Sequence, residues 1–410
     1  MTIRWITPLL GTAPALSVTT EENLNIIDVR DLVDKAGNLP DSILNKITAG
    51  CESLRAGHKT VICCDYGISR SNAIAVGIIS IYQSISFEKA VRYVLDSTGE
   101  KEIKAEPLSA VRKALGKSNI YCHVKPHLLI TGATGFIGQA VNLKLSTEYT
   151  VVTPTSKEVD LRCGSTQLDL LVGENEVDII LHLANPRVYT SNVALGESLT
   201  MLRNVMDVCI SRDIKLIYLS SWEVYSGYRS TNLKADELLP LAPKGPYAET
   251  KYLCELLIEH SRRAQGLKCT MLRSSPVYGG GSDKPKFIFN FIDKIKSGLE
   301  VITHQYKNCF PSIDLLYIDD LVLAIYKTIQ SDFIGNINVG TGVLTSTKVI
   351  AEKLNLKLLG NSDINFNHID SYTACIAIDS TVAKTKIGWE PSINIDQGLE
   401  LIISKVKIDK

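Results

Sequence analysis

The sequence predicts two α/β domains in one chain, a small one over residues 1–116 and a larger doubly wound parallel sheet over residues 127–410. Three observations predict this fold class. Strand-like and helical runs alternate in both parts, and a glycine-rich turn restarts the pattern just after residue 127. A length of 410 residues, 45% of them hydrophobic, is enough for two or three buried cores. Residues 117–126 are expected to form a connector.

The small domain alternates short strands with longer helical runs. We expect its strands at 24–29 and 60–64 and its helices at 42–57, 73–83 and 86–97, with Ser86 as an N-cap. The second of these strands therefore leads through a short loop into a helix.

The large domain repeats a strand-then-helix pattern, as expected for a doubly wound parallel sheet. Its strands are expected at 128–131, 149–154, 177–184, 214–221 and 269–275. After about residue 280 the pattern loosens, and part of that region is predicted to form a smaller C-terminal lobe over the sheet.

Composition and charge exclude several classes of protein. Lysine plus arginine and aspartate plus glutamate number 44 each, so no net charge points to nucleic acid or an anionic membrane. The longest apolar run, 73–82, is shorter than the ~20 residues a membrane span needs. No signal peptide and no pair of CxxC motifs is evident among the ten cysteines. We therefore expect a reduced, cytoplasmic protein without a metal site.

The stretch "VICCDYGISRSNAIAVGII" places a cysteine where chemistry with phosphate is feasible. Cys64 ends a strand and faces a helix N-terminus, an environment that lowers a thiol pKa. Gly67 lets the loop curl so that its N–H groups point inward and form an anion nest. Arg70 offers a planar fork to two phosphate oxygens, and Ser71 can donate a hydrogen bond to the sulfur.

This Cys-x5-Arg-Ser pattern resembles the signature of the dual-specificity-type cysteine phosphatases, over most of residues 1–116. The resemblance implies a phosphomonoester substrate, either a phosphoprotein or a small molecule, with Cys64 as nucleophile. It implies an aspartate as the leaving-group acid, for which Asp31 is favoured and Asp34 is the runner-up. Cys63 replaces the histidine that usually precedes the nucleophile, which leaves open a domain that only binds phosphate and regulates.

The stretch "LLITGATGFIG" places three glycines between a strand and a helix. Gly132 permits a tight turn, Gly135 lets the backbone approach a pyrophosphate, and Gly138 lets the helix pack close to the strand. The sequence therefore predicts a dinucleotide site at this turn.

A second motif, "PYAETK", places Tyr247 and Lys251 four residues apart on one helix face. Oxidation of a carbinol needs a base for the hydroxyl proton as hydride leaves. A tyrosine with a pKa of ~10 is too weak unless a neighbouring cation lowers that value, and Lys251 is placed to do so. Ser221, at a strand end, is expected to hold the oxygen that is oxidised or reduced.

This part resembles the extended short-chain dehydrogenases, which have a Rossmann fold and include nucleotide-sugar epimerases, dehydratases and reductases. The similarity runs from about 127 to 406 and includes "HLAN", "LLYIDDL" and "NVGTG". It implies a nucleotide-sugar substrate handled at C4 of the hexose and is compatible with a homodimer. It also implies cofactor contacts from the glycine turn and from Phe136, Ile137, Ala184, Asp160, Leu161, Tyr247 and Lys251.

Two positions bear on the cofactor and the reaction. Thr155, Ser156 and Lys157 follow the second strand where an acidic residue would favour NAD, so NADP is slightly preferred over NAD. Glu223 lies where related enzymes carry an acid or base. The aspartate that precedes it in the 4,6-dehydratases is Trp222 here, which disfavours full dehydratase chemistry.

The sequence as a whole predicts a bifunctional enzyme, a cysteine phosphatase joined to an NAD(P)-dependent nucleotide-sugar epimerase or reductase. One alternative keeps the oxidoreductase and makes the small domain a phosphate-binding regulatory module. Another is a dinucleotide-binding redox sensor without turnover, against which the intact set of Ser221, Tyr247 and Lys251 argues.

Overall fold

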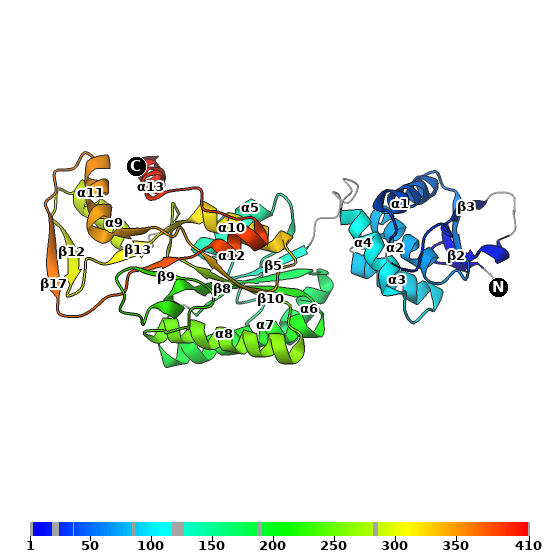
Figure 1. Cartoon of the computed structure of the whole chain (residues 1–410), viewed down its shortest axis with the longest axis horizontal. Helices are drawn as coiled ribbons and strands as arrows, with labels where there is room; N and C mark the ends of the chain where they lie inside the picture. The colour runs from blue at the N-terminus through cyan, green and yellow to red at the C-terminus, as the bar shows by residue number, and fades with distance from the viewer. Residues whose placement is uncertain are drawn as a thin grey trace. The chain divides into compact units, whose positions relative to one another are not determined.

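The computed structural model describes residues 3–18, 24–35, 37–83, 85, 87–116, 127–186, 188, 191–281 and 286–408. The chain divides into two units, unit 1 from Met1 to Pro126 and unit 2 from His127 to Lys410 (Figure 1). The expected connector at 117–126 and the expected N-cap Ser86 lie outside the described residues. No helix among the described residues is long and apolar enough to cross a membrane.

Unit 1 contains a four-stranded sheet with the order β1-β2-β4-β3. Its strands are β1 (Arg4–Trp5), β2 (Leu10–Pro14), β3 (Leu24–Asp28) and β4 (Lys59–Cys64). Both β2 and β3 run parallel to β4, whereas β1 is antiparallel to β2. Because β4 lies between two neighbours, every residue after Lys59 in it is buried, down to Cys64 at its carboxyl end.

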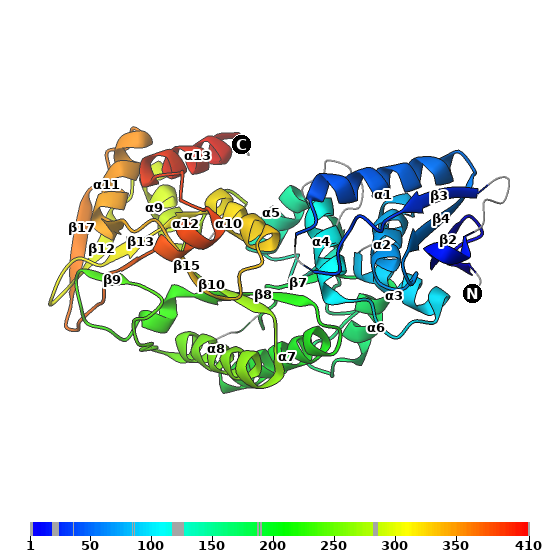
Figure 2. The same cartoon turned by 45° about the vertical axis from the view of Figure 1, so that its right-hand side comes forward.

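Four helices gather on one side of this sheet in Figure 2. They are α1 (Pro40–Arg55), α2 (Arg70–Tyr82), α3 (Phe87–Thr98) and α4 (Ala105–Gly116), and a 3-10 turn, η1, spans Ala15–Ser17. Helix α2 contacts the other three helices, and its residues from Ser71 to Ser80 are all buried. A helix that is apolar all round is a buried helix, which explains the run after the cysteine loop.

Some boundaries differ from the sequence expectation. Helix α1 begins at Pro40. Proline is favoured at the first position of a helix, because the N–H group that it lacks would have no partner within the helix there. Helix α2 begins at Arg70 rather than at residue 73, so the Arg-Ser pair belongs to its first turn. Strand β2 and helix α4 were not expected as elements, since "LGTAP" is rich in turn formers and α4 carries Pro107.

Unit 2 is built on a six-stranded parallel sheet with the order β15-β10-β8-β7-β5-β6. The strands are β5 (His127–Thr131), β6 (Thr150–Val152), β7 (Ile179–His182), β8 (Lys215–Ser221), β10 (Cys269–Ser274) and β15 (Gly335–Val339). The chain starts at β5, goes outward to β6 and returns to β7 on the other side. This reversal makes a crevice at the carboxyl ends of β5 and β7, where ligands of such sheets bind.

Helices cover both faces of the sheet (Figure 1). One face carries α6 (Thr166–Glu174), α7 (Asn192–Ser211) and α8 (Pro246–Gln265), and the other carries α5 (Phe136–Leu145), α10 (Ile318–Gln330) and α12 (Thr381–Ile387). Two separate buried clusters result, and they account for the apolar strands seen in the sequence.

The region after residue 280, called the smaller lobe below, shares one buried cluster with a face of the six-stranded sheet. Its main elements are the parallel pair β12 (Val301–Tyr306) and β17 (Ile364–Ile369), with α9 (Lys286–Lys296) and α11 (Thr347–Lys357). The other described elements of the unit are the helix α13 (Ile395–Ile408) and several short ones: η3 (Trp222–Tyr225), β9 (Leu233–Ala235), β11 (Val277–Tyr278), β13 (Ser312–Asp314), β14 (Leu316–Tyr317), β16 (Leu344–Ser346) and β18 (Ile376–Ile378).

Candidate functional site

The turn between β5 and α5 in unit 2 contains two glycines, Gly132 and Gly138, that leave no room for a Cβ. Gly132 has φ +75°, and a Cβ on it would lie 2.7 Å from the backbone nitrogen of Ala184. A Cβ on Gly138 would lie 2.3 Å from the carbonyl oxygen of Gly132. Gly135 is the N-cap of α5, so the free N–H groups of Phe136 and Ile137 begin the helix there. This geometry fits a pyrophosphate at a helix N-terminus.

Ser221, Tyr247 and Lys251 come from β8 and α8, which contact each other. Ser221 ends β8, and its Oγ accepts a hydrogen bond from the Glu223 N–H at 3.2 Å. Tyr247 lies in the first turn of α8, and Lys251 follows one turn later. The Lys251 Nζ lies 5.8 Å from the centre of the Tyr247 ring.

The Lys251 ammonium is buried, and its direct hydrogen-bond acceptors are two uncharged oxygens. Lys251 is only 2% exposed. Its Nζ donates to the Leu219 carbonyl at 2.8 Å and to the Tyr218 hydroxyl at 3.2 Å. Burial lowers the pKa of Lys251 to about 8. Burial also raises the pKa of Tyr218, so its hydroxyl stays protonated and presents a lone pair to Nζ. Tyr218 was not singled out in the sequence, where it is one more residue in a strand-like run.

His182, the first residue of the "HLAN" motif, lies next to this group. Burial, followed by the Lys251 charge, lowers the pKa of His182 to about 3, so the imidazole is neutral. Its Nδ1 lies 2.7 Å from the Thr131 Oγ1, and its ring stacks on Tyr218 at 5.9 Å between centroids. A neutral histidine here adds no second positive charge beside Lys251.

Glu223 lies in η3, directly after the strand that carries Ser221. Burial raises the pKa of its carboxyl group, which favours the protonated form relative to an exposed glutamate. Glu223 is thus a partly buried carboxyl group whose backbone N–H donates to the Ser221 Oγ.

The residues expected to contact the adenosine lie after β6. Ser156 and Lys157 are exposed, whereas the Thr155 N–H and Oγ1 both donate to Glu158 at 2.8 Å. Asp160 is held by Arg162, and the Leu161 carbonyl accepts from Asn204 at 2.7 Å. The sequence analysis did not single out Glu158. Its spacing of three residues from Thr155 is a signal that could have found it, because threonine side chains often take part in such local hydrogen bonds.

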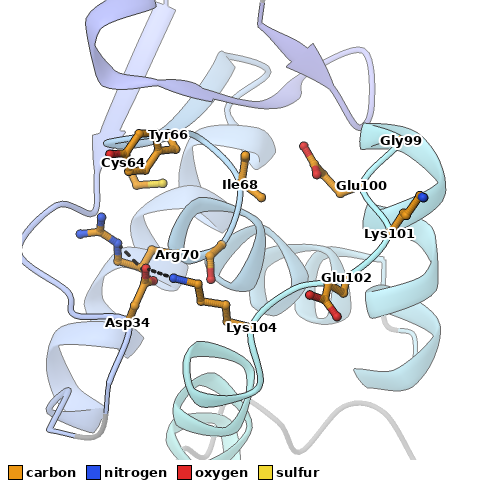
Figure 3. Close-up of a pocket in the computed structure, with 11 residues that line it drawn as sticks. Asp34, Cys64, Tyr66, Ile68, Arg70, Gly99, Glu100, Lys101, Glu102 and Lys104 are labelled. Atoms are coloured by element: carbon orange, nitrogen blue, oxygen red, sulfur yellow. Dashed lines mark hydrogen bonds and ion pairs between the residues drawn. The ribbon is translucent and has the colours of Figure 1, made fainter.

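Unit 1 brings Cys64 and its loop together as expected. Cys64 is 2% exposed; its Sγ accepts from the Gly67 N–H at 3.1 Å and lies 3.4 Å from the Ser71 Oγ. Burial by itself raises the pKa of Cys64, but hydrogen bonds from Ser71, Gly67 and Ile68 outweigh it and lower the pKa below its ordinary value. The thiol lines a cavity of about 540 Å³ (Figure 3).

Arg70 lines the same cavity, and both of its terminal nitrogens already have partners. Nη1 donates to the Leu32 carbonyl at 2.9 Å, Nη2 donates to Asp65, and Nε lies 3.4 Å from Asp34. Figure 3 shows Asp34 between Arg70 and Lys104, whose Nζ lies 2.8 Å from it. The guanidinium therefore faces two carboxylates, which would compete with a phosphate for it.

The two aspartates considered as leaving-group acid are separated by the fold. Asp34 lines the cavity beside Cys64 and Arg70, whereas Asp31 pairs with Lys46 at 2.8 Å and is not among the lining residues. On geometry the runner-up Asp34 is the better candidate. Arg4 was missed in the sequence: from β1 it donates to the Gly67 carbonyl and pairs with Glu100 at the cavity rim. No local pattern signals such a contact, since Arg4 is far from the loop in sequence.

A family model described as "NAD dependent epimerase/dehydratase family" matches residues 128–340, which is more than half of the 410 residues. The chain belongs to this family. The match lies wholly within unit 2, and unit 1 is outside it.

One relative of this chain is the low-salt glycan biosynthesis protein Agl12 of Haloferax volcanii. The two sequences are 27% identical over a region that covers 60% of this chain and 76% of the relative. The dTDP-4-dehydro-6-deoxyglucose reductase of Escherichia coli is 24% identical over 69% of this chain and 98% of its own length. The UDP-glucose 4-epimerase of Thermus thermophilus, solved with NAD, shares the fold with a TM-score of 0.59 at 21% identity, covering 68% of this chain and 99% of that one.

Membership of the family makes unit 2 an NAD(P)-binding enzyme, and the expected Rossmann sheet is confirmed. The residues fit a dinucleotide, because the glycine turn leaves room for the pyrophosphate at the start of α5. The assignments of single residues, of the substrate and of NADP over NAD stay predictions, as does everything expected of the cysteine loop.

Proposed function

We propose that unit 2 is an NAD(P)-dependent epimerase or reductase acting at C4 of the hexose in a nucleotide sugar. The observation that carries the proposal is the placement of Ser221, Tyr247 and Lys251 at the carboxyl end of β8 and the first turns of α8. The relatives add support, since one is named as a nucleotide-sugar reductase and a protein with the same fold as a nucleotide-sugar epimerase.

The roles of the residues follow from their positions. The nicotinamide cofactor supplies hydride acceptance and donation when it is bound. The Tyr247 hydroxyl takes the C4 hydroxyl proton during oxidation and returns it during reduction. Lys251, held by the Leu219 carbonyl and Tyr218, stabilises negative charge on that hydroxyl, and Ser221 holds the C4 oxygen. Glu223 is placed to donate a second proton to a sugar hydroxyl or ring carbon.

Tyr247→Phe tests this proposal. Dinucleotide affinity should stay within about twofold, because the glycine turn holds the pyrophosphate. Turnover of a 4-keto or 4-hydroxy nucleotide sugar should fall by the ~10²–10⁴ typical of a lost general acid/base. Tyr252→Phe, on the same helix, is the matched control and should keep its turnover. Wild-type turnover in Tyr247→Phe would contradict the assignment, and a wild type that binds dinucleotide but turns over no sugar would point to a sensor.

For the cofactor we propose NADP over NAD, because exposed Ser156 and Lys157 follow β6 and can accept a 2′-phosphate. The double variant Ser156→Ala, Lys157→Ala should weaken NADP much more than NAD in a titration of dinucleotide fluorescence. Equal weakening, or protein purified already loaded with NAD, would reverse the preference and favour epimerisation, in which hydride is removed and returned within one turnover.

A second function is favoured by one observation in unit 1, the buried Cys64 thiol with a lowered pKa at the base of a cavity. We propose that it is the nucleophile of a phosphomonoester phosphatase, with Ser71 donating to the sulfur and Asp34 protonating the leaving group. The alternative is a phosphate-binding regulatory module, which the paired state of Arg70 also permits.

Cys64→Ser should abolish hydrolysis of p-nitrophenyl phosphate and still bind tungstate, a phosphate analogue. Cys51→Ser is the control, since Cys51 is a buried thiol of the same unit and is not among the residues that line the cavity. Tungstate binding by a wild type that hydrolyses nothing would support the regulatory module. A wild type that neither binds tungstate nor hydrolyses p-nitrophenyl phosphate would contradict both the phosphatase and the regulatory module.

A further inference from the structure

Two cysteines that no proposed activity uses meet in the smaller lobe of unit 2. Cys309 follows β12, and Cys375 immediately precedes β18. Their sulfur atoms lie 3.4 Å apart, although the residues are 66 positions apart in the chain. Cys375 is 1% exposed, whereas Cys309 is partly exposed. One residue of the pair is therefore partly open to solvent, and the other is buried.

Besides the contacts of the Cys375 sulfur with Ser312 and Phe310, hydrogen bonds that do not involve sulfur hold the two segments together. The side-chain amide of Asn308 donates to the Thr373 carbonyl at 2.7 Å, and its oxygen accepts from the Thr373 N–H at 3.1 Å. The Lys307 N–H donates to the Ser371 carbonyl at 3.0 Å, and the Lys307 side chain pairs with Asp370. Because these contacts already bring the thiols together, little conformational freedom remains to be lost when they react.

We propose that Cys309 and Cys375 are a redox-active dithiol that a peroxide converts to an intramolecular disulfide. The Cys309 thiol first releases its proton, and the thiolate attacks one peroxide oxygen as the O–O bond breaks. The hydroxide that leaves takes up that proton and becomes water, so Cys309 is now a sulfenic acid. The Cys375 sulfur then attacks the Cys309 sulfur, the S–OH bond breaks, and a second water leaves. Two thiols and one hydrogen peroxide thus give one disulfide and two waters, and a dithiol reductant reverses the change. The proposal does not depend on either proposed activity.

The position of the pair determines what the bond would do. Besides its sulfur contact, Cys375 donates its N–H to the Ser230 carbonyl at 2.9 Å, and its own carbonyl accepts from Leu233 at 3.2 Å. A bond to Cys309 would therefore join the segment after β12 to the strands β9 and β18. Closing a loop of this length restricts the unfolded chain strongly, so the oxidised lobe should be harder to unfold.

The resting state is expected to be the dithiol. Burial and the neighbouring Cys375 thiol raise the pKa of Cys309 to about 11, which keeps its thiolate scarce at neutral pH. The pair should therefore react slowly with peroxide and, once oxidised, should persist until a reductant acts.

Peptide mapping of the full chain tests the proposal directly. The protein is treated with hydrogen peroxide, the remaining thiols are alkylated with iodoacetamide under denaturing conditions, and the chain is digested with trypsin. The two cysteines lie in different tryptic peptides, 308–327 and 358–384, each with one cysteine. We expect these peptides to appear as one cross-linked species that dithiothreitol separates. Both peptides recovered fully alkylated, or Cys309 recovered as sulfinic acid without a cross-link, would overturn the proposal.

Two variants complete the test. Cys309→Ser should lose the cross-link and the peroxide-induced rise in the melting temperature. Cys163→Ser, which removes an exposed cysteine elsewhere in unit 2, should keep both. If Cys309→Ser shows the same rise in melting temperature as the wild type, another thiol is responsible and the proposal is wrong.

Discussion

The two candidate sites place a buried reactive group at the same kind of position but balance its charge differently. In both, a parallel strand ends and a helix begins, with Cys64 on the strand of unit 1 and Lys251 on the helix of unit 2. Cys64 is surrounded by hydrogen-bond donors, which favour a thiolate. Lys251 is held by a carbonyl and a hydroxyl, which accept from an ammonium but carry no opposing charge.

The difference lies in what a ligand meets on entering each site. In unit 1 the cation Arg70 is paired with Asp65 and Asp34, so an anionic ligand competes with carboxylates. In unit 2 the pyrophosphate is offered backbone N–H groups at the start of α5. Unit 2 therefore offers backbone donors that are already in place, whereas an anion that entered the cavity of unit 1 would compete with the carboxylates paired to Arg70.

The largest expected effect comes from the glycine that shapes each loop. Gly67 (φ +68°) and Gly132 (φ +75°) have no room for a Cβ, which would lie 2.3 Å from the Ala13 carbonyl carbon and 2.7 Å from the Ala184 nitrogen. Strain of about 1–3 kcal/mol is expected for each alanine variant before the clash is added. Gly67→Ala should lose tungstate binding with NADP binding unchanged, and Gly132→Ala should do the reverse.

Matched controls exist for this pair. Gly57 and Gly266 also have positive φ, but neither has an atom within 4 Å of an added Cβ. Their alanine variants should lower the melting temperature modestly and keep both ligands, as measured by calorimetric titration. If either Gly67→Ala or Gly132→Ala loses both ligands, the two sites are not independent.

The next effect concerns the buried charge of Lys251 and the pH dependence of stability. Burial lowers its pKa from 10.5 to about 8, so between these values the unfolded chain binds more protons than the folded one. The contribution of Lys251 to the free energy of unfolding should therefore be unfavourable and constant below about pH 8, and should improve as pH rises toward 10.5.

Urea unfolding of wild type and Lys251→Met at several pH values measures this contribution. Between about pH 8 and 10.5, the free energy of unfolding of the wild type should rise relative to that of Lys251→Met. Lys144 is exposed, so the Lys144→Met variant should show the same pH dependence as the wild type. Parallel curves for wild type and Lys251→Met would mean that Lys251 keeps its ordinary pKa in the folded chain.

The smallest effect is expected from Asp65, because its side chain is 52% exposed. An exposed ion pair contributes about 0.2–1 kcal/mol, so Asp65→Asn should tighten tungstate binding up to about fivefold by freeing Arg70. Glu52→Gln, which removes a charge from the exposed side of α1, is the control. Weaker binding in Asp65→Asn would mean that Asp65 orders the loop rather than competing with the ligand.

Several features of the fold and of the candidate sites could be predicted from local sequence patterns alone. The two-part division near residue 127, the glycine turn and the helix that carries Tyr247 and Lys251 are local patterns, and local patterns follow from backbone geometry and apolar periodicity. The Cys64 loop is local as well, since Gly67 and Ser71 reach the sulfur from within seven residues.

Only the tertiary structure decided which distant groups meet these local motifs. It placed Asp34, and not Asp31, among the residues that line the cavity, brought Arg4 to the Gly67 carbonyl, and brought Tyr218 to Lys251. It also brought Cys309 to Cys375 across 66 positions. No periodicity encodes such contacts, because they depend on which strands pair and how their ends align. Their consequences for charge, burial and pKa therefore appear only when the chain is folded.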